Sequence, residues 1–189
     1  MAGLFESAGG GGAAIALEEL EVSILRSLEV GILQLIGPGP GGDGGDPLAA
    51  LFAEGPSETP ANPVLARLFP DAYGDPAEPA DEESRAAAGE FRRYTELDLR
   101  ARKREDALHV VRTLDRLGGG GVLKLDPADC QRWLGALNDL RLTLGVQLEV
   151  GEDDDELYEL PDEDDRKPLV MAYLWLGALQ ETLLEAIVD

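Results

Sequence analysis

The sequence predicts a mainly α-helical protein: a bundle of about four long helices with short docked helices, leaving open a minimal two-stranded sheet. Apolar residues recur at three- and four-residue steps in long stretches, which is the periodicity of amphipathic helices. Apolar residues make up 44% of the chain but aromatic residues only 5%, so the core must consist mostly of Leu, Ala, Val and Ile. With 189 residues, the chain is expected to form one helical domain over 1–189.

The N-terminal region predicts a flexible start followed by the first long helix. Residues 1–12 are rich in glycine and are expected to be flexible. Ala13–Leu17 fits either a short strand or the lead into a helix. The helix covers 18–36 and ends at Gly37-Pro38, which stops the pattern. Its apolar seam should consist of Leu20, Ile24, Leu28, Ile32 and Leu35.

Two Gly/Pro-rich segments, 37–47 and 71–80, are expected to be flexible linkers. Asp46-Pro47 and Asn62-Pro63 each combine an N-cap residue with proline at the first helical position. They predict two short helices that dock on the main body, over 47–53 and 63–69.

The longest helix is expected over 82–117, with acids in its first turn and Gly118 as its stop. Nine of the sixteen basic residues of the chain lie between Arg85 and Arg116, against six acids, so this helix is the only locally positive element. Its apolar seam should consist of Tyr94, Leu97, Ala101, Leu108, Val111 and Leu114.

Two further helices complete the predicted bundle. Val122–Leu125 fits a short strand that pairs with Ala13–Leu17, and Asp126-Pro127 is a clear helix start. The last helix, 168–188, is apolar on nearly all sides and is expected to be the most buried. The helix that starts at Asp126 should pack on it or on the long helix through Trp133, Leu137, Leu140, Leu144 and Leu148.

A polar inset interrupts this leucine-rich helix at Asn138, Asp139 and Arg141. Because buried polar groups usually find partners, the favoured interpretation is a structural network in which Asp139 or Asn138 pairs with arginines of the long helix. The alternative is a ligand site built from the same groups. The candidate arginines are Arg92, Arg93, Arg100 and Arg104.

An acidic loop is predicted over 149–165, which holds eleven carboxylates and no basic residue. It is either a solvated loop or a recognition surface for a basic partner, and the two interpretations stay open. A calcium site is not expected, because the glycine and glutamate of an EF-hand do not follow in register. The residues expected to carry recognition are Asp153, Asp154, Asp155, Leu157, Tyr158 and Leu160.

Composition excludes several classes of function. A net charge of −22 disfavours binding to nucleic acid and to anionic membranes. Cys130 and His109 are the only cysteine and histidine, which excludes an internal disulfide and a cysteine zinc site. Cys130 is expected to be buried, and no catalytic, cofactor or metal site is expected. Without a recognisable signal peptide or spanning segment, a cytoplasmic location is expected.

Three stretches resemble the domain-of-unknown-function family 2017 of high-GC bacteria: Glu90–Ala107, Leu125–Gly145 and Leu20–Leu28. That family has no assigned activity, so the resemblance implies no site residues. Its members are often encoded near a Clp-protease adaptor, a Mov34-type metallopeptidase and a ubiquitin-like sulfur carrier. The resemblance therefore implies a setting close to proteolysis or sulfur transfer.

The expected function is that of a non-catalytic regulatory or adaptor-like module that binds another protein. The partner is expected to be basic and linked to proteolysis, and the sequence does not give the oligomeric state. The alternative is a small-ligand or anion-binding protein, or an enzyme, with a polar site between the Arg-rich helix and the helix of Asn138 and Asp139.

Overall fold

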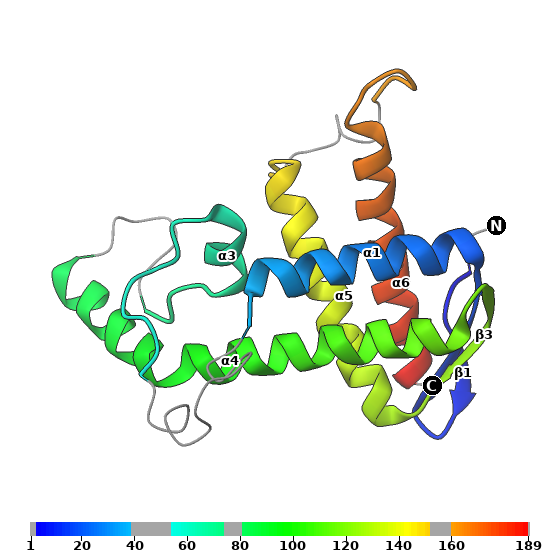
Figure 1. Cartoon of the computed structure of the whole chain (residues 1–189), viewed down its shortest axis with the longest axis horizontal. Helices are drawn as coiled ribbons and strands as arrows, with labels where there is room; N and C mark the ends of the chain where they lie inside the picture. Colours follow the sequence, from blue (N-terminus) through cyan, green and yellow to red (C-terminus); the bar gives the residue numbers. More distant parts are fainter. Residues whose placement is uncertain (1–2, 39–53, 74–80, 152–159, 189) are drawn as a thin grey trace.

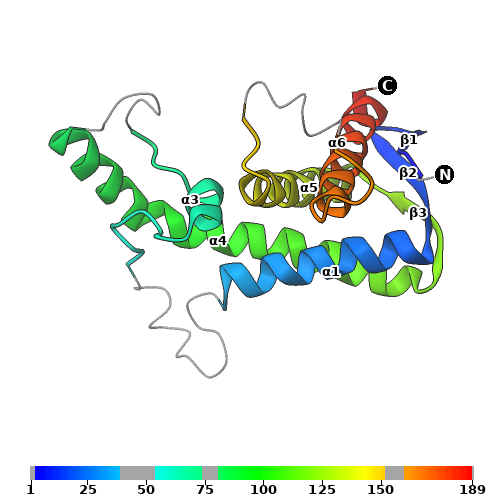
Figure 2. The same ribbon diagram turned by 90° about the horizontal axis from the view of Figure 1, so that it is seen from above.

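Helices dominate the computed structural model, which describes residues 3–38, 54–73, 81–151 and 160–188 (Figure 1). Helix α4 (Glu82–Leu117) is the longest, and α1 (Glu19–Ile36) lies along it in the opposite direction. Helices α5 (Pro127–Gln147) and α6 (Lys167–Val188) cross this pair side by side (Figures 1 and 2). The predicted mainly α fold is confirmed.

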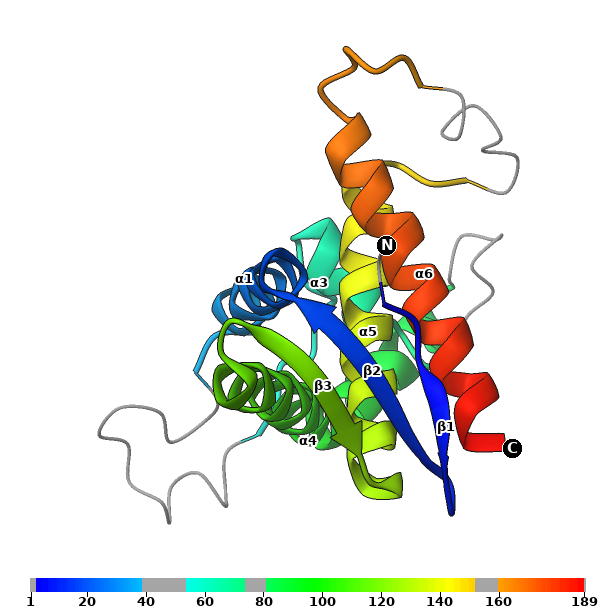
Figure 3. The same cartoon turned by 90° about the vertical axis from the view of Figure 1, so that its right-hand side faces the viewer.

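A small sheet closes one end of the helices (Figure 3). Strands β1 (Glu6–Gly9), β2 (Gly12–Glu18) and β3 (Gly120–Leu125) are antiparallel in the order β1-β2-β3. Pairing of the two predicted strands is confirmed, since Ala13 lies opposite Leu125 and Glu18 opposite Gly120.

The sheet has a third strand, β1, beyond the two strands whose pairing the sequence left open. Residues 6–9 lie in the segment 1–12 that was expected to be flexible, yet they form β1. The reason is the turn that follows. Gly9, Gly10 and Gly11 all have positive φ, between 63° and 79°, which reverses the chain into a hairpin that glycine adopts without strain.

The core is centred on α5. Trp133 is fully buried, with the ring of Phe5 edge-on at a centroid distance of 6.0 Å. Leu137, Leu140 and Leu144 are also buried, and α5 contacts both α4 and α6, as predicted. The expectation that α6 is the most buried helix was wrong. It packs on one side only and leaves Met171, Leu184 and Val188 exposed.

Helix α1 presents a different face to the core from the predicted one. Leu20 is 69% exposed and Ile24 is 36% exposed. The phase is fixed at the start of the helix, because β2 leads directly into α1 and a capping box joins Glu18 to Glu21. The residues of α1 that are buried are Val22, Leu25, Glu29, Ile32 and Ile36.

The predicted seam of α4 is only half correct. Val111 and Leu114 are buried, but Tyr94 is 67% exposed and Ala101 is also exposed. In the first half of α4, the inward positions are instead taken by Arg92 and Glu96, which bind each other.

Helix α3 (Pro63–Leu68) forms as predicted, with the Asn62 side chain accepting hydrogen bonds from the backbone N–H of Val64 and Leu65 at 2.9 and 3.1 Å. The predicted helix over 47–53, most of the linker 37–47 and residues 74–80 of the linker 71–80 lie outside the described residues. Within the described part of the chain, no helix is both long and apolar enough to span a bilayer.

Candidate functional site

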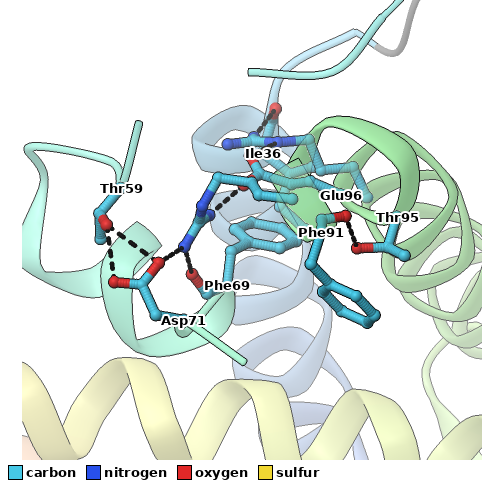
Figure 4. Close-up of polar contacts among 9 residues, drawn as sticks. Ile36, Thr59, Phe69, Asp71, Phe91, Thr95 and Glu96 are labelled. Carbon is cyan, nitrogen blue, oxygen red and sulfur yellow. Dashed lines mark hydrogen bonds and ion pairs between the residues drawn. The ribbon is translucent and has the colours of Figure 1, made fainter. Parts of the chain in front are cut away.

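Arg92 is the centre of a buried ionic cluster on α4, and Figure 4 labels its partners Phe69, Asp71 and Glu96. Its side chain is 4% exposed and forms an ion pair with Glu96, which is 3% exposed. Its Nη2 donates to the backbone oxygen of Phe69 at 2.9 Å and to Asp71 Oδ1 at 2.7 Å. These hydrogen bonds hold the segment after α3 against α4. The pKa of Asp71 is lowered, mainly by the hydrogen bond from Arg92.

Arg100 and Arg104 bind the C-terminal end of α1. Arg100 Nη1 donates to the backbone oxygen of Ile36 at 3.3 Å, and Arg104 Nη1 donates to that of Gly37 at 3.0 Å. A helix C-terminus carries carbonyl groups without helical partners and partial negative charge, so two arginines stabilise it. Arg100 also pairs with Glu96 at 2.8 Å, which links this cap to the Arg92 cluster.

Asp139 is held by a lysine, and the prediction of an arginine partner was wrong. Lys103 Nζ lies 2.5 Å from Asp139 Oδ1. Arg92, Arg100 and Arg104 make the contacts described above, and Arg93 pairs with Glu54 at 2.6 Å. The arginines at 92, 100 and 104 point toward the segment after α3 and toward α1. Position 103 lies on the face of α4 that meets α5.

Two further carboxyl groups interact with Asp139, and we call Glu29, Asp106, Asp139 and Lys103 the Glu29 cluster. Glu29 is 1% exposed, and among the described residues neither of its carboxyl oxygens has a hydrogen-bond partner. Burial first, and then the charges of Asp139 and Asp106, raise its pKa to about 8. Burial also raises the pKa of Asp139 despite Lys103.

The Glu29 cluster therefore keeps a neutral carboxyl group at the α1–α4–α5 contact at pH 7. Sequence reasoning missed Glu29, although it lies four residues after Leu25 and three before Ile32. In the phase that α1 adopts, this position faces the core. Among the described residues, no group of three or more His, Cys, Asp or Glu side chains is arranged to hold a metal ion.

Asn138 and Arg141 line an open pocket of about 580 Å³ on α5, and the Asn138 side chain also hydrogen-bonds Asp139. Arg141 Nη1 donates to Gln180 Oε1 at 2.8 Å, and its guanidinium lies 5.4 Å from the ring centroid of Tyr173. The other cation of this pocket is Arg67 of α3, whereas the sequence predicted arginines of the long helix. Asn138 and Asp139 therefore contact each other as neighbours, whereas the predicted arginines of the long helix bind elsewhere.

Residues 152–159 of the acidic loop lie outside the described residues. This holds for Asp153, Asp154, Asp155, Leu157 and Tyr158, so their predicted role in recognition stays a prediction. Leu160 is described, and its backbone oxygen accepts a hydrogen bond from Lys167 Nζ at 2.8 Å. Lys167 also pairs with Asp162, and Arg166 pairs with Asp164. Basic residues directly after the loop therefore neutralise part of its charge.

Cys130 and His109 lie in ordinary surroundings. Cys130 is fully buried, as predicted, and burial raises the pKa of its thiol. His109 Nε2 lies 2.8 Å from Asp129 Oδ1, which fits a boundary residue that holds the start of α5 to α4. A raised thiol pKa lowers the thiolate fraction and hence the reactivity of Cys130.

An apolar groove lies where α1, α3, α5 and α6 meet, with a volume of about 360 Å³. The exposed Leu20 and Ile24 extend its α1 wall toward the start of that helix. The rotation of α1 about its axis determines which of its side chains form this surface. Leu20 and Ile24 were predicted to lie in the core on the assumption of a different rotation. Its main apolar walls are Leu28, Leu35, Val64, Leu140, Leu144 and Leu169.

Comparison with known proteins places this architecture in a family. The model of a domain of unknown function, DUF2017, matches residues 1–187. The chain belongs to the DUF2017 family. Proteins named "Oxidative stress regulator AosR" in Mycobacterium tuberculosis and Mycobacterium bovis are 32% identical over 173 residues, covering 87% of this chain and 77% of theirs. A "Putative oxidative stress regulator AosR" of Mycobacterium leprae is 32% identical over 176 residues, covering 88% of this chain and 78% of its own. No solved structure matches the chain.

Proposed function

We propose that this DUF2017 protein is a non-catalytic regulator that acts by binding another protein in the response to oxidants. The observation that carries the proposal is the row of exposed apolar side chains on α1, with Leu20 at 69% and Ile24 at 36% exposure. Exposed apolar rows beside a groove are typical of protein contact sites. The link to oxidants comes from the similar mycobacterial proteins, which are named as oxidative stress regulators.

Regulation by binding a partner fits the chemistry of the chain better than regulation by oxidation of its own cysteine. Cys130 is its only cysteine, so no disulfide can form within the chain. The thiol is fully buried and its pKa is raised, which makes it a slow target for peroxide. We therefore assign oxidant sensing to the partner and the regulatory contact to this protein. A partner linked to proteolysis remains part of the proposal.

The test compares strains that carry variant genes. A strain lacking the gene is complemented with wild type, with Leu20→Asp plus Ile24→Asp, with Val122→Asp and with Cys130→Ala. Val122 is 62% exposed on β3 and serves as the matched control. We expect the double variant to lose survival in hydrogen peroxide and to lose its co-purified partner, while the other two behave as wild type. Full rescue by the double variant would refute the role of the α1 row, and loss in Cys130→Ala at normal protein level would refute a thiol-independent role.

A small-ligand site is the second candidate function, and the pocket of Arg67, Asn138, Arg141 and Tyr173 favours it. Its lining holds two arginines and one carboxylate, Glu149, so the excess positive charge beside an amide and an aromatic ring suits a carboxylate or phosphate group. Isothermal titration with inorganic phosphate and with succinate tests it, with Arg141→Gln as the variant. Saturable binding that Arg141→Gln removes would support a ligand-binding function. Absence of heat at millimolar concentrations would leave Arg141 as a structural residue.

A further inference from the structure

We propose that the groove between α1, α3, α5 and α6 binds a basic amphipathic helix of the partner protein. This inference rests on the proposed function as a contact regulator and adds the place of the contact and the chemistry of the partner. Three features carry it: the shape of the apolar surface, an unexplained glycine in α1, and the distribution of charge.

The apolar surface has the form that a helix requires. Leu20, Ile24, Leu28, Gly31 and Leu35 follow one another at steps of four, four, three and four, which places them on one face of α1. They span sixteen positions, roughly 22 Å along the helix at about 1.5 Å per residue, enough for a facing helix of about fifteen residues. Helices that bind in grooves use apolar anchors at i, i+3, i+4 and i+7, the same spacing.

The walls of the groove come from several elements. Leu28 and Leu35 of α1 face Val64 of α3, Leu144 of α5 and Leu169 of α6 across the groove. In Figure 1, the ends of α5 and α6 rise past α1, so these helices form one side of a corner and α1 forms the other. Among the described residues, the groove is lined by apolar side chains and a few uncharged polar ones. A partner must therefore present apolar side chains to its floor.

Gly31 lies in the middle of α1, where glycine costs about 1 kcal/mol relative to alanine. Within the described residues, no packing contact accounts for a glycine here. A Cβ atom at this position would meet no atom of the described chain within 4 Å, and Gly31 does not have positive φ. The missing side chain leaves a hole between Leu28 and Leu35 on an exposed surface. A large side chain of a facing helix can fill that hole, as a knob fills a hole in helix packing.

Charge selects a basic helix. Exposed carboxylates lie beside the apolar surface, with Glu19 next to Leu20 and with Glu163 and Asp165 before Leu169. The two cations that follow Asp165, Arg166 and Lys167, are already paired with Asp164 and Asp162. The whole chain carries a net charge of −22, which repels a second copy and attracts a cation-rich segment. A partner helix with leucines on one face and Lys or Arg on its flanks fits both the floor and the rim.

The test uses the full chain and a synthetic probe. The probe is a fluorescein-labelled 18-residue peptide with Leu or Ile at helical spacing and Lys or Arg at the other positions. A second peptide has Glu in place of the basic residues. Anisotropy titrations compare wild type with Gly31→Leu, which fills the hole without changing charge, and with Leu28→Glu. Val122→Glu makes the same charge change on an exposed β3 residue away from the groove and is the control.

We expect wild type and Val122→Glu to bind the basic peptide and not the acidic one. Gly31→Leu and Leu28→Glu should bind at least tenfold more weakly. Gly31→Ala should raise the melting temperature, because alanine stabilises helix α1. It should also weaken binding of the peptide, because its methyl group narrows the hole. Opposite signs of these two effects distinguish a docking surface from a structural defect.

Three results would overturn the proposal. Equal binding by all variants would show a purely electrostatic attraction. A dimer in sedimentation equilibrium that Gly31→Leu abolishes would assign the groove to a second copy. If the peptide binds only after Leu51 and Phe52 of the predicted helix 47–53 are changed to Ser, the occupant of the groove would be that segment of the same chain. If the groove variants leave peptide binding unchanged while Leu20→Asp plus Ile24→Asp still abolishes rescue in peroxide, regulation by protein contact is retained and only the proposed basic helix is refuted.

Discussion

Lys103 Nζ lies 2.5 Å from Asp139 Oδ1, and this pair joins α4 to α5 inside the protein. Lys103 contacts one of three carboxyl groups that influence one another, because Glu29 and Asp106 both interact electrostatically with Asp139. The pair therefore controls the charge of a buried region that lies between three helices.

Lys103→Met should destabilise the protein by about 3 kcal/mol at pH 7, because Asp139 is left buried without its cation. Arg26→Met is the control, since Arg26 and Asp115 form a pair whose side chains are 47% and 48% exposed. That change should leave the unfolding midpoint nearly unchanged, because water screens an exposed ion pair. Urea unfolding curves give both values, and equal midpoints for Lys103→Met and wild type would show that Asp139 is solvated.

Glu29 should make stability depend on pH. Its pKa is raised from the ordinary 4.5 to about 8 in the folded protein, so the folded state binds a proton that the unfolded state releases. This stabilisation is fully present below about 4.5 and is lost as pH rises to about 8, at roughly 1.4 kcal/mol per pH unit.

Glu29→Gln, which stays neutral, should remove this slope and unfold at a higher temperature than wild type at pH 8. Glu90→Gln, at an exposed position of α4, is the matched control and should leave the slope unchanged. Melting temperatures measured from pH 5 to 9 test the prediction. Parallel curves for wild type and Glu29→Gln would contradict a buried, protonated Glu29.

Arg92→Met should loosen the segment around α3 and lower stability by about 3–5 kcal/mol, because Glu96 is left buried with less positive charge. Arg93→Met is the comparison, since Arg93 and Glu54 are 37% and 66% exposed and their pair is worth less than about 1 kcal/mol. Limited proteolysis should show cleavage between 54 and 73 in Arg92→Met first. Identical cleavage in the two variants would show that the Arg92 cluster does not hold this segment.

Gly120→Ala should destabilise the sheet by roughly 1–3 kcal/mol. Gly120 has a φ of 106°, and a Cβ there would lie 2.8 Å from the backbone oxygen of Leu17. At the neighbouring Gly119 a Cβ would meet nothing within 4 Å, so Gly119→Ala should be nearly neutral. Thermal unfolding of the two variants separates backbone strain from the general effect of losing a glycine.

Changing Asp153, Asp154 and Asp155 to Asn tests the acidic loop as a recognition surface. If the loop steers a basic partner, the variant should retain less of it in a pull-down at low salt, and wild type should lose it as salt rises. If the amount of retained partner changes with neither the substitutions nor the salt concentration, the loop serves solubility and not recognition.

The sequence by itself determined the helices and most of their ends. Helical spacing, Asn62-Pro63, Asp126-Pro127 and the stop at Gly118 predicted α3, α4 and α5 closely. It also predicted the burial of Trp133 and Cys130 and the polar inset on α5. These features depend on interactions within a few residues, so local physical chemistry is enough to predict them.

Only the tertiary structure decided how each helix is rotated about its axis and which side chains meet. Helix α1 is apolar over a wide arc, so periodicity alone did not distinguish Leu20 and Ile24 from Val22 and Leu25. The join with β2 selected the second pair for the core, left the first pair exposed, and buried Glu29. The partner of Asp139 likewise depended on which face of α4 meets α5, where a shift of one residue replaces an arginine by Lys103. Contacts between distant segments set these phases, and the sequence of one helix does not contain them.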